Sequence, residues 1–288
     1  MRQLAIALPD GYRSADVFAF HSRDAEGVAE AVTPGRIRKA VMLDRAPVLF
    51  DVEIAEREAL VHVDGAAPSG VREALSGILG LRIDPAPFMA AFGDDALLGA
   101  VIRRQPGLRI VQSATVFEAL TWAIIGQQIN LPFAIALRRT FIQLGGRRHQ
   151  SGLWCYPEAA DVARLELDAL TSRKFSRAKA ETLLRLARLV DDGELLLSHD
   201  DDPAHASQQL LQVKGIGPWT VNYTLLRGYG YPDCSLHGDV AIRAAFQRLL
   251  GADEKPGIAA TEALLERYRP HRTMAAAYLW ASLHQPAG

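Results

Sequence analysis

Residues 210–220 read LLQVKGIGPWT, and the organisation of the chain is clearest here. An apolar-periodic segment runs into Gly215-Ile216-Gly217, and Pro218 then suits the first position of a second helix. Glycine permits backbone angles that are barred to other residues, so we expect a tight reversal between two helices. Amides exposed at such a turn can donate to a phosphate, helped by the dipole of the second helix. The alternative is an ordinary corner between helices that binds no ligand.

A carboxylate follows this turn at a helix start. His237-Gly238-Asp239 comes about twenty residues later, where Gly238 breaks the chain and Asp239 opens the next apolar-periodic segment. An aspartate at a helix start is a common N-cap, which is one explanation for it. A fixed carboxylate can also stabilise positive charge in a reaction and position or deprotonate an attacking water. The two roles are compatible.

The rest of the chain divides into an N-terminal part with strands and a longer helical part. Alternation of Val48, Phe50 and Val52 predicts a strand, and we expect strands at 36–43, 47–54 and 59–63, a break at 65–70 and a helix at 71–79. Helices are predicted at 115–128, 134–144, 177–190 (capped by Ser176), 206–213, 218–227, 239–250, 261–268 and 273–283. The fold class is therefore mostly α with an N-terminal α+β domain, at 1–88 and 89–288.

Composition excludes several classes of protein. The chain has 288 residues, is 49% hydrophobic and carries a net charge of −1, which is ordinary for a soluble globular protein. Cys155 and Cys234 are too few for a disulfide framework or a four-thiolate cluster. We find no apolar run of the ~18 residues that a membrane span needs, and no secretion signal. We therefore expect a cytoplasmic protein, and the net charge does not exclude a local basic face for nucleic acid.

Five pieces of the sequence resemble the helix-hairpin-helix superfamily of DNA glycosylases, and within it the bacterial 3-methyladenine-DNA glycosylases II. They are LQVKGIGPWTVNY (211–223), LRG (226–228), LHGD (236–239), AIIGQQ (123–128) and RPHR (269–272). The chain length and the α/β N-terminal part also fit. The resemblance covers nearly the whole chain, strongly from residue 115 onward and weakly before it. It implies a helix-hairpin-helix glycosylase fold, with the hairpin at about 204–228.

The resemblance also implies a function. The protein would be a base excision repair enzyme that flips an alkylated purine, such as 3-methyladenine, from double-stranded DNA and hydrolyses the N-glycosidic bond. It would leave an abasic site, act as a monomer without a cofactor, and work on the nucleoid. The alternatives are a non-catalytic helix-hairpin-helix DNA-binding protein and a glycosylase for deaminated or oxidised bases.

In this family the aspartate after the hairpin is catalytic, which points to Asp239. Trp219 and Tyr223 would stack on the flipped base, since residues four apart share a helix face. Two core aromatics would show the same spacing. Aromatic faces attract a cationic alkylated purine by roughly 0.5–2 kcal/mol. Bifunctional relatives carry a lysine near the start of the second helix, where this chain has Trp219, so we expect simple hydrolysis without strand cleavage.

Two further pocket residues follow from looser matches. Phe20 would complete the pocket from the N-terminal domain, with Phe18 as its competitor. His271 stands where we expect relatives to have a tryptophan, and a protonated His271 would disfavour a cationic base. This position therefore bears on the range of lesions.

The expected DNA contacts surround the hairpin. Gln128 is the candidate wedge that fills the gap left by the flipped base, and Arg177 belongs to the basic run 173–179 (RKFSRAK). At the hairpin itself the candidates are Gly215, Gly217, Lys214 and Thr220. The family also implies a monovalent cation at the carbonyls of Leu211 and Val213. No cluster of histidine or cysteine suggests a catalytic metal.

Overall fold

A five-stranded antiparallel sheet forms the N-terminal part of the computed structural model, which describes residues 2–65 and 70–284. The strands are β1 (Arg2–Ala7), β2 (Glu30–Thr33), β3 (Arg36–Leu43), β4 (Ala46–Ile54) and β5 (Glu58–Asp64), in the order β1-β5-β4-β3-β2. The three strands expected from alternation are confirmed as β3, β4 and β5, whereas β1 and β2 were not predicted. Part of the expected break at 65–70 lies outside the described residues.

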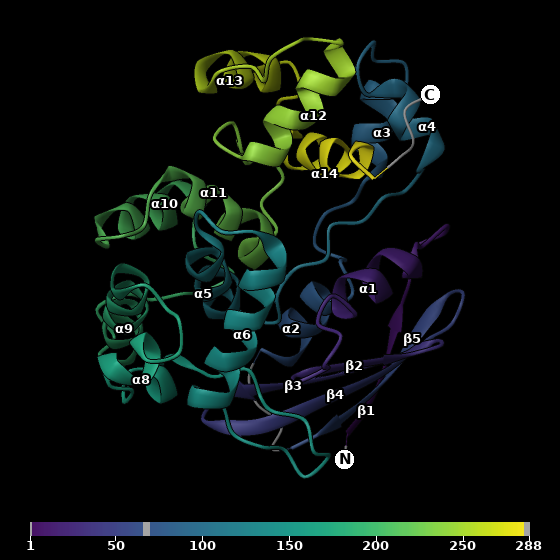
Figure 1. Ribbon diagram of the computed structural model, residues 1–288. Coiled ribbons are helices and arrows are strands. Elements are labelled where there is room, and N and C mark those ends of the chain that lie inside the picture. Colours follow the sequence, from purple (N-terminus) through teal and green to yellow (C-terminus); the bar gives the residue numbers. More distant parts are fainter. Residues whose placement is uncertain (1, 66–69, 285–288) are drawn as a thin grey trace.

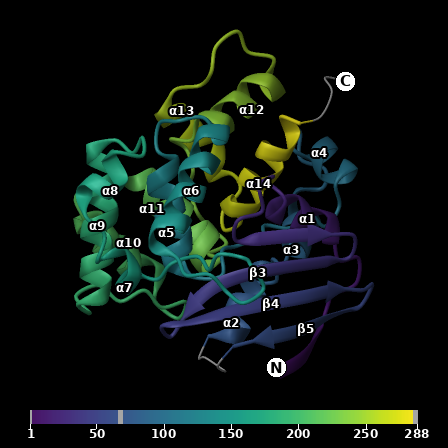
Figure 2. The same ribbon diagram turned by 60° about the horizontal axis from the view of Figure 1, so that its bottom comes forward.

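The hairpin between β3 and β4 sets the register of the sheet. Leu43 pairs with Ala46, so Asp44 and Arg45 form a two-residue loop, and both have positive φ. Such a loop matches the right-handed twist of the strands. One face of the sheet is turned to the viewer in Figure 2 and the helices lie behind it. Buried Val48, Phe50 and Val52 line the sheet's contact with the helices.

The helices fall into three groups, which Figure 1 shows. Next to the sheet lie α1 (Ser14–His21) and α2 (Val71–Ile78). A second group comprises α5 (Val116–Gly126), α6 (Leu131–Gly145), α7 (Ala159–Val162), α8 (Leu167–Thr171), α9 (Arg177–Asp191), α10 (Pro203–Gln212) and α11 (Pro218–Thr224), which continues as the π-helical turn η1 (Leu225–Tyr229). The third group comprises α12 (Val240–Leu250), α13 (Ile258–Glu266) and α14 (Arg272–Ser282), together with α3 (Ala86–Phe92) and α4 (Gly99–Arg104). The predicted class, mostly α with an N-terminal α+β domain, is confirmed.

The expected domain boundary at residue 88 falls inside α3. The ring of Phe88 stacks on that of Tyr278 in α14 at 5.5 Å and lies 6.2 Å from that of Tyr268. Since α3 buries its apolar side against the C-terminal helices, the helical region begins before residue 89. Sequence periodicity shows that a helix has an apolar face, but not which layer that face packs against.

A buried cluster of four charges joins the sheet to the helices. Lys39 on β3 donates to Glu30 on β2 at 2.6 Å and to Glu118 on α5 at 2.7 Å. Arg138 on α6 donates to Glu30 at 2.8 Å and to Glu118 at 3.0 Å. Although burial opposes ionisation, the charges of Arg138 and Lys39 hold the pKa values of both glutamates below their ordinary range. The cluster therefore fixes α5 against the sheet.

No helix among the described residues combines the length and apolar character needed to cross a bilayer.

Candidate active site

The hairpin expected at about 204–228 lies between α10 and α11. Gly215 has φ +98°, and a Cβ there would lie 2.1 Å from Oγ1 of Thr182, so only glycine fits. Gly217 is different: its φ of −110° and ψ of 177° are extended backbone that any residue adopts. The expectation of special backbone angles is therefore wrong at Gly217. A Cβ at Gly217 would meet nothing within 4 Å, so its missing side chain leaves the start of α11 open to close approach.

The end of α5 braces this hairpin. The side-chain amide of Gln127 donates to the carbonyl of Gly215 at 3.1 Å and to Oγ1 of Thr220 at 2.9 Å. Thr220 is only 2% exposed, so its hydroxyl cannot serve as the DNA contact that we expected. Thr220 instead holds the hairpin to α5. Lys214 is exposed, and its carbonyl accepts a hydrogen bond from Arg185 on α9 at 3.1 Å.

Asp239 is held by four hydrogen-bond donors. Its Oδ1 accepts the amides of Ala241 and Ile242, each at 3.0 Å, which confirms Asp239 as the N-cap of α12. The indole Nε1 of Trp219 donates to Oδ2 at 3.0 Å, and that of Trp280 donates to Oδ1 at 3.2 Å. These four bonds fix the direction of the carboxylate, and the residue is half-buried, so it is not sealed off from solvent.

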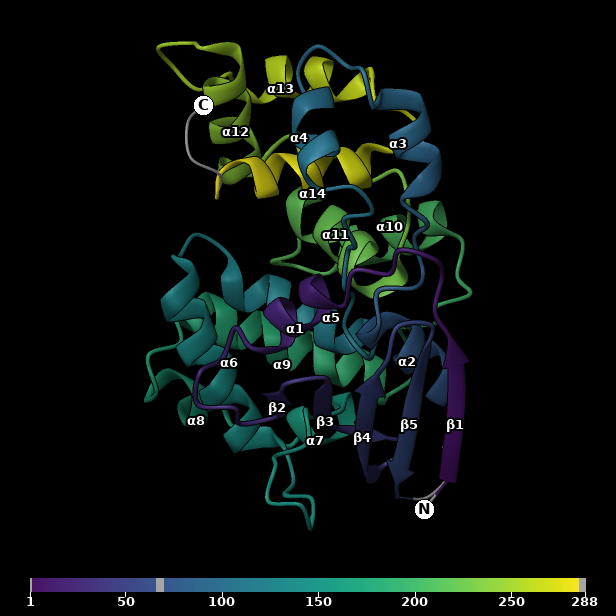
Figure 3. The ribbon, with the colours of Figure 1, turned by 90° about the vertical axis from the view of Figure 1, so that its right-hand side faces the viewer.

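The loop that carries Asp239 is clamped from two sides. Arg272, at the start of α14, pairs with both carboxylate oxygens of Asp233 at 2.7 and 2.8 Å. Burial opposes ionisation of Asp233, but the hydrogen bonds and charge of Arg272 hold its pKa below the ordinary value. From the other side, Oδ1 of Asn222 on α11 accepts the amide of Ser235 at 3.0 Å. Helices α11 and α14 therefore both position Asp239, and Figures 1 and 3 show them as neighbouring layers.

Three half-buried aromatic residues, Trp219, Tyr223 and Trp280, form an aromatic wall beside Asp239. The rings of Trp219 and Tyr223 are 5.2 Å apart and tilted by 30°, and those of Tyr223 and Trp280 are 6.4 Å apart. The hydroxyl of Tyr223 accepts a hydrogen bond from the indole of Trp122 on α5 at 2.9 Å. Trp219 and Tyr223 share a helix face, as their spacing predicted, and that face lies beside the carboxylate.

Trp280 was not predicted, and it lies where we expected His271. His271 stands at the N-cap of α14, with its ring edge-on to that of Phe88 at 6.4 Å. Trp280 lies near the other end of this 11-residue helix and is hydrogen-bonded to Asp239. The geometry thus places Trp280 beside Asp239, and His271 beside Phe88, so the effect of His271 on the lesion range stays a prediction. The one signal in the sequence for the position of Trp280 was the presence of a tryptophan in the helix predicted at 273–283.

Phe20, at the end of α1, faces the same region. The guanidinium of Arg227 lies 5.0 Å from the ring of Phe20 and 5.6 Å from that of Trp280, so it links α1 to the aromatic wall. Phe18, the alternative to Phe20, packs with Phe20 against the small apolar cluster that contains Val17, but only Phe20 of the two contacts Arg227. The geometry favours Phe20 over Phe18 as the residue nearer to the wall.

The remaining expected DNA contacts lie on the surface around the hairpin. Gln128 is exposed directly after α5, with a left-handed φ of +56°. Arg177, at the start of α9, is exposed and paired with Glu181 at 2.8 Å. The carbonyl of Val213 accepts the amide of Ile216 at 3.0 Å and keeps one lone pair, which fits its expected role toward a monovalent cation. These roles, and that of the Leu211 carbonyl, stay predictions.

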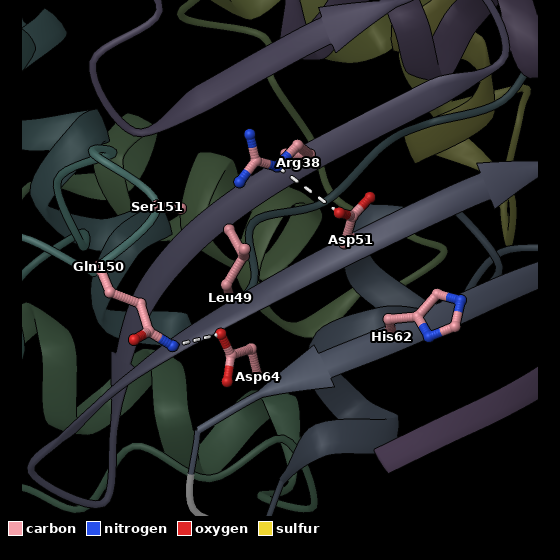
Figure 4. A pocket seen from close by; sticks show the side chains of 7 residues that line it. All are labelled: Arg38, Leu49, Asp51, His62, Asp64, Gln150 and Ser151. Carbon is pink, nitrogen blue, oxygen red and sulfur yellow. Dashed lines mark hydrogen bonds and ion pairs between the residues drawn. The ribbon is translucent and has the colours of Figure 1, made fainter. Parts of the chain in front are cut away.

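A hollow of about 340 Å³ lies on the outer face of the sheet (Figure 4), and its lining does not include Asp239. Its polar side chains pair among themselves: Gln150 donates to Asp64 at 2.7 Å, and Arg38 pairs with Asp51 at 3.6 Å. Among the residues that the structure describes, no group of three or more histidine, cysteine, aspartate or glutamate side chains could hold a metal ion. The combination of a fixed carboxylate and an aromatic wall makes the region of Asp239 the candidate active site.

Comparisons with known proteins identify the family of the chain. Residues 121–270 match the model of the HhH-GPD superfamily base excision DNA repair proteins. The chain is 32% identical over 191 residues to the putative DNA-3-methyladenine glycosylase YfjP of Bacillus subtilis, and the match spans 65% of each chain. It is 31% identical over 210 residues to a DNA-3-methyladenine glycosylase of the same organism, covering 70% of this chain and 68% of that protein.

Structural comparison extends the likeness to the N-terminal sheet. A 3-methyladenine DNA-glycosylase from Archaeoglobus fulgidus superimposes with a TM-score of 0.82, covering 96% of this chain and 97% of that one at 23% identity. At this identity the match shows a shared fold. The family model covers the hairpin and Asp239 and extends over more than half of the chain. The chain thus belongs to the HhH-GPD superfamily of base excision DNA repair proteins.

Proposed function

We propose that the protein is a monofunctional DNA-3-methyladenine glycosylase that hydrolyses the N-glycosidic bond of alkylated purines flipped out of double-stranded DNA. The observation that carries this proposal is the carboxylate of Asp239, held by the indoles of Trp219 and Trp280 at the edge of the aromatic wall. The names of the relatives point to the same substrate class.

Asp239 suits the chemistry of glycosidic cleavage. When the base leaves, positive charge develops on the sugar, and a fixed anion beside the anomeric carbon stabilises that charge. The two indole donors and the two helix amides orient the carboxylate before the reaction, so little reorganisation is needed. Because the residue is not sealed off from solvent, the same carboxylate can position the attacking water.

The aromatic wall suits an alkylated purine. Alkylation of a ring nitrogen leaves the base with a positive charge, and the faces of Trp219, Tyr223 and Trp280 attract such a ring. Because the wall adjoins the carboxylate, a base stacked on it would bring its sugar toward Asp239. Stacking also offsets part of the cost of extruding the base from the duplex.

The positions of the lysines support a reaction by hydrolysis without strand cleavage. The chain has five lysines, and none donates to Asp239 among the described residues. Lys39 is engaged in the buried charge cluster, and the amine of Lys179 donates to the carbonyl of Ile125 at 2.7 Å. Lys214 lies before the hairpin turn. A lyase would need a lysine amine in the first turn of α11, and this chain has Trp219 there.

DNA would approach across the hairpin. The open amides near Gly217 would bind phosphate, Gln128 would enter the duplex, and Lys214 and Arg177 would contact the backbone. A monovalent cation at the carbonyls of Leu211 and Val213 would add positive charge beside the phosphate. We also propose that the protein acts as a monomer, on the nucleoid in the cytoplasm.

Incubation with methylated duplex DNA tests the proposal. We expect release of free 3-methyladenine, detected by chromatography, with the DNA strands intact until the abasic sites are cleaved by alkali. Binding without release of any methylated base would instead support a non-catalytic DNA-binding protein. Release confined to duplexes with hypoxanthine or 8-oxoguanine would point to deaminated or oxidised bases and contradict the proposal.

A further inference from the structure

Arg23, in the loop between α1 and β2, lies between two aromatic rings. Its guanidinium carbon is 3.9 Å from the ring centre of Phe20 and 4.8 Å from that of Trp122. Two such contacts restrict a side chain that otherwise has many rotamers, so the planar guanidinium is held in one place.

The hydrogen-bond donors of Arg23 are unused within the described part of the chain. No hydrogen bond or ion pair from its guanidinium is formed there, although the side chain is half-buried. Some buried polar atoms in this protein have no hydrogen-bond partner, but the nitrogen atoms of Arg23 do not belong to that set. They are therefore at least partly open to solvent. Burial, and next the charge of Arg138, lower its pKa to about 10, which still leaves Arg23 protonated at neutral pH. A fixed cation with free donors therefore borders the site.

Arg23 lies at the opposite end of the aromatic wall from Asp239. Trp122, one of the two rings that hold Arg23, donates to the hydroxyl of Tyr223. Trp219, at the other end, donates to Asp239. A base that stacks on the wall with its sugar at Asp239 would therefore direct its far edge toward Arg23.

We propose that Arg23 determines specificity by donating to a carbonyl oxygen at C6 of the extruded purine, which favours 7-methylguanine and hypoxanthine over 3-methyladenine. This inference rests on the proposed function. The exocyclic group of 3-methyladenine is an amino donor, which cannot accept from a guanidinium. Arg23 also repels a cationic base, and only a base with a carbonyl acceptor offsets that repulsion by a charge-assisted hydrogen bond.

A ratio measured in one reaction tests this role. Methylated duplex DNA contains both 7-methylguanine and 3-methyladenine, so chromatography gives the initial release rates of both bases from one sample. In Arg23→Gln we expect the ratio of 7-methylguanine to 3-methyladenine to fall about tenfold, the effect of losing one hydrogen bond to a charged donor. Because both rates come from the same protein sample, a smaller folded fraction cancels from the ratio.

Two variants serve as controls. Arg23→Lys keeps a cationic donor but loses the planar stacking, so we expect the ratio to lie between those of wild type and Arg23→Gln. Arg57→Gln changes an exposed arginine that pairs loosely with Asp10 at 3.7 Å, and should leave the ratio unchanged. Hypoxanthine excision from a defined duplex should fall together with 7-methylguanine release.

The outcomes separate this inference from the proposed function. If wild type releases neither methylated base, the proposed function fails and this inference fails with it. If wild type releases both but Arg23→Gln leaves their ratio unchanged, only the role of Arg23 is overturned. Loss of both bases together in Arg23→Gln also overturns it, because Arg23 would then act in folding or DNA binding.

Discussion

Replacing Lys39 with methionine removes one charge from the buried cluster that joins the sheet to α5 and α6. Lys39 is 1% exposed and contacts both Glu30 and Glu118. Methionine has a similar length and no charge, so the change leaves Arg138 as the one ion-pair partner of the two buried carboxylates among the described residues. Breaking a buried ion pair by removing one partner costs about 3–5 kcal/mol. Since a domain is typically stable by about 5–15 kcal/mol, this loss is large.

Urea denaturation at pH 7, followed by tryptophan fluorescence, measures this loss. The double variant Lys39→Met with Glu118→Gln leaves Arg138 paired with Glu30 and no excess charge, so it should recover about 1–3 kcal/mol relative to the single variant. Arg57→Met breaks only an exposed pair at 3.7 Å, and should cost less than about 1 kcal/mol. A Lys39→Met loss no larger than that of Arg57→Met, with no recovery in the double variant, would refute the reasoning.

The same cluster predicts sensitivity to acid. The folded-state pKa values of Glu30 and Glu118 are lowered, mainly because Arg138 and Lys39 outweigh the effect of burial. Their stabilising contribution is therefore complete above the unfolded glutamate pKa of about 4.3 and is lost as the pH falls from there through the lower folded values. Glu118→Gln should flatten this part of the curve of unfolding free energy against pH. A slope identical to that of wild type would contradict the assignment.

The remaining predictions concern the site and the hairpin. Trp280→Phe keeps an aromatic ring but removes one donor to Asp239, so single-turnover base release should slow about tenfold, whereas His271→Ala should leave the rate unchanged. Equal effects of these two variants would contradict the placement of the pocket. Gly215→Ala should lower both thermal stability and DNA affinity, because its Cβ would meet a threonine side chain at 2.1 Å. Gly217→Ala should weaken DNA binding, measured by fluorescence anisotropy, without changing the melting temperature, because the added Cβ meets nothing within 4 Å. A lower melting temperature would show that the space at residue 217 is not open, which would contradict the placement of an open amide there.

Local patterns allowed the hairpin and the acid to be predicted from sequence. The glycines, Pro218 and Asp239 act within a few residues of their own positions, so helix ends and caps follow from the residue types. Gly217 shows the limit of this reasoning. The backbone angles at residue 217 do not require glycine, and the missing side chain instead leaves open space at the start of α11. Thr220 shows another limit, since its burial depends on α5, which precedes it by about a hundred residues.

What could not be predicted depends on contacts between distant segments. Trp280 reaches Asp239 because α14 packs against α12, the helix that Asp239 caps, and no spacing in the sequence encodes that. Lys39 and Glu118 look like surface residues in a linear reading, and only the packing of the sheet on α5 buries them together. Strand β2 is four residues long, too short to show a clear period. These are tertiary effects that override local preference.

Asp239→Asn is the most direct test of the account. Asparagine is as good an N-cap as aspartate, because its one amide oxygen, in the position of Oδ1, still accepts from the helix amides and from the indole of Trp280. Its NH2 group would face the indole of Trp219 and lose that one bond, so the fold should be retained while the negative charge is lost. Under single-turnover conditions we predict that release of 3-methyladenine slows by at least about a hundredfold. The affinity for duplex DNA should remain unchanged. A variant that still releases the base at the wild-type rate would show that the charge at residue 239 takes no part in the reaction.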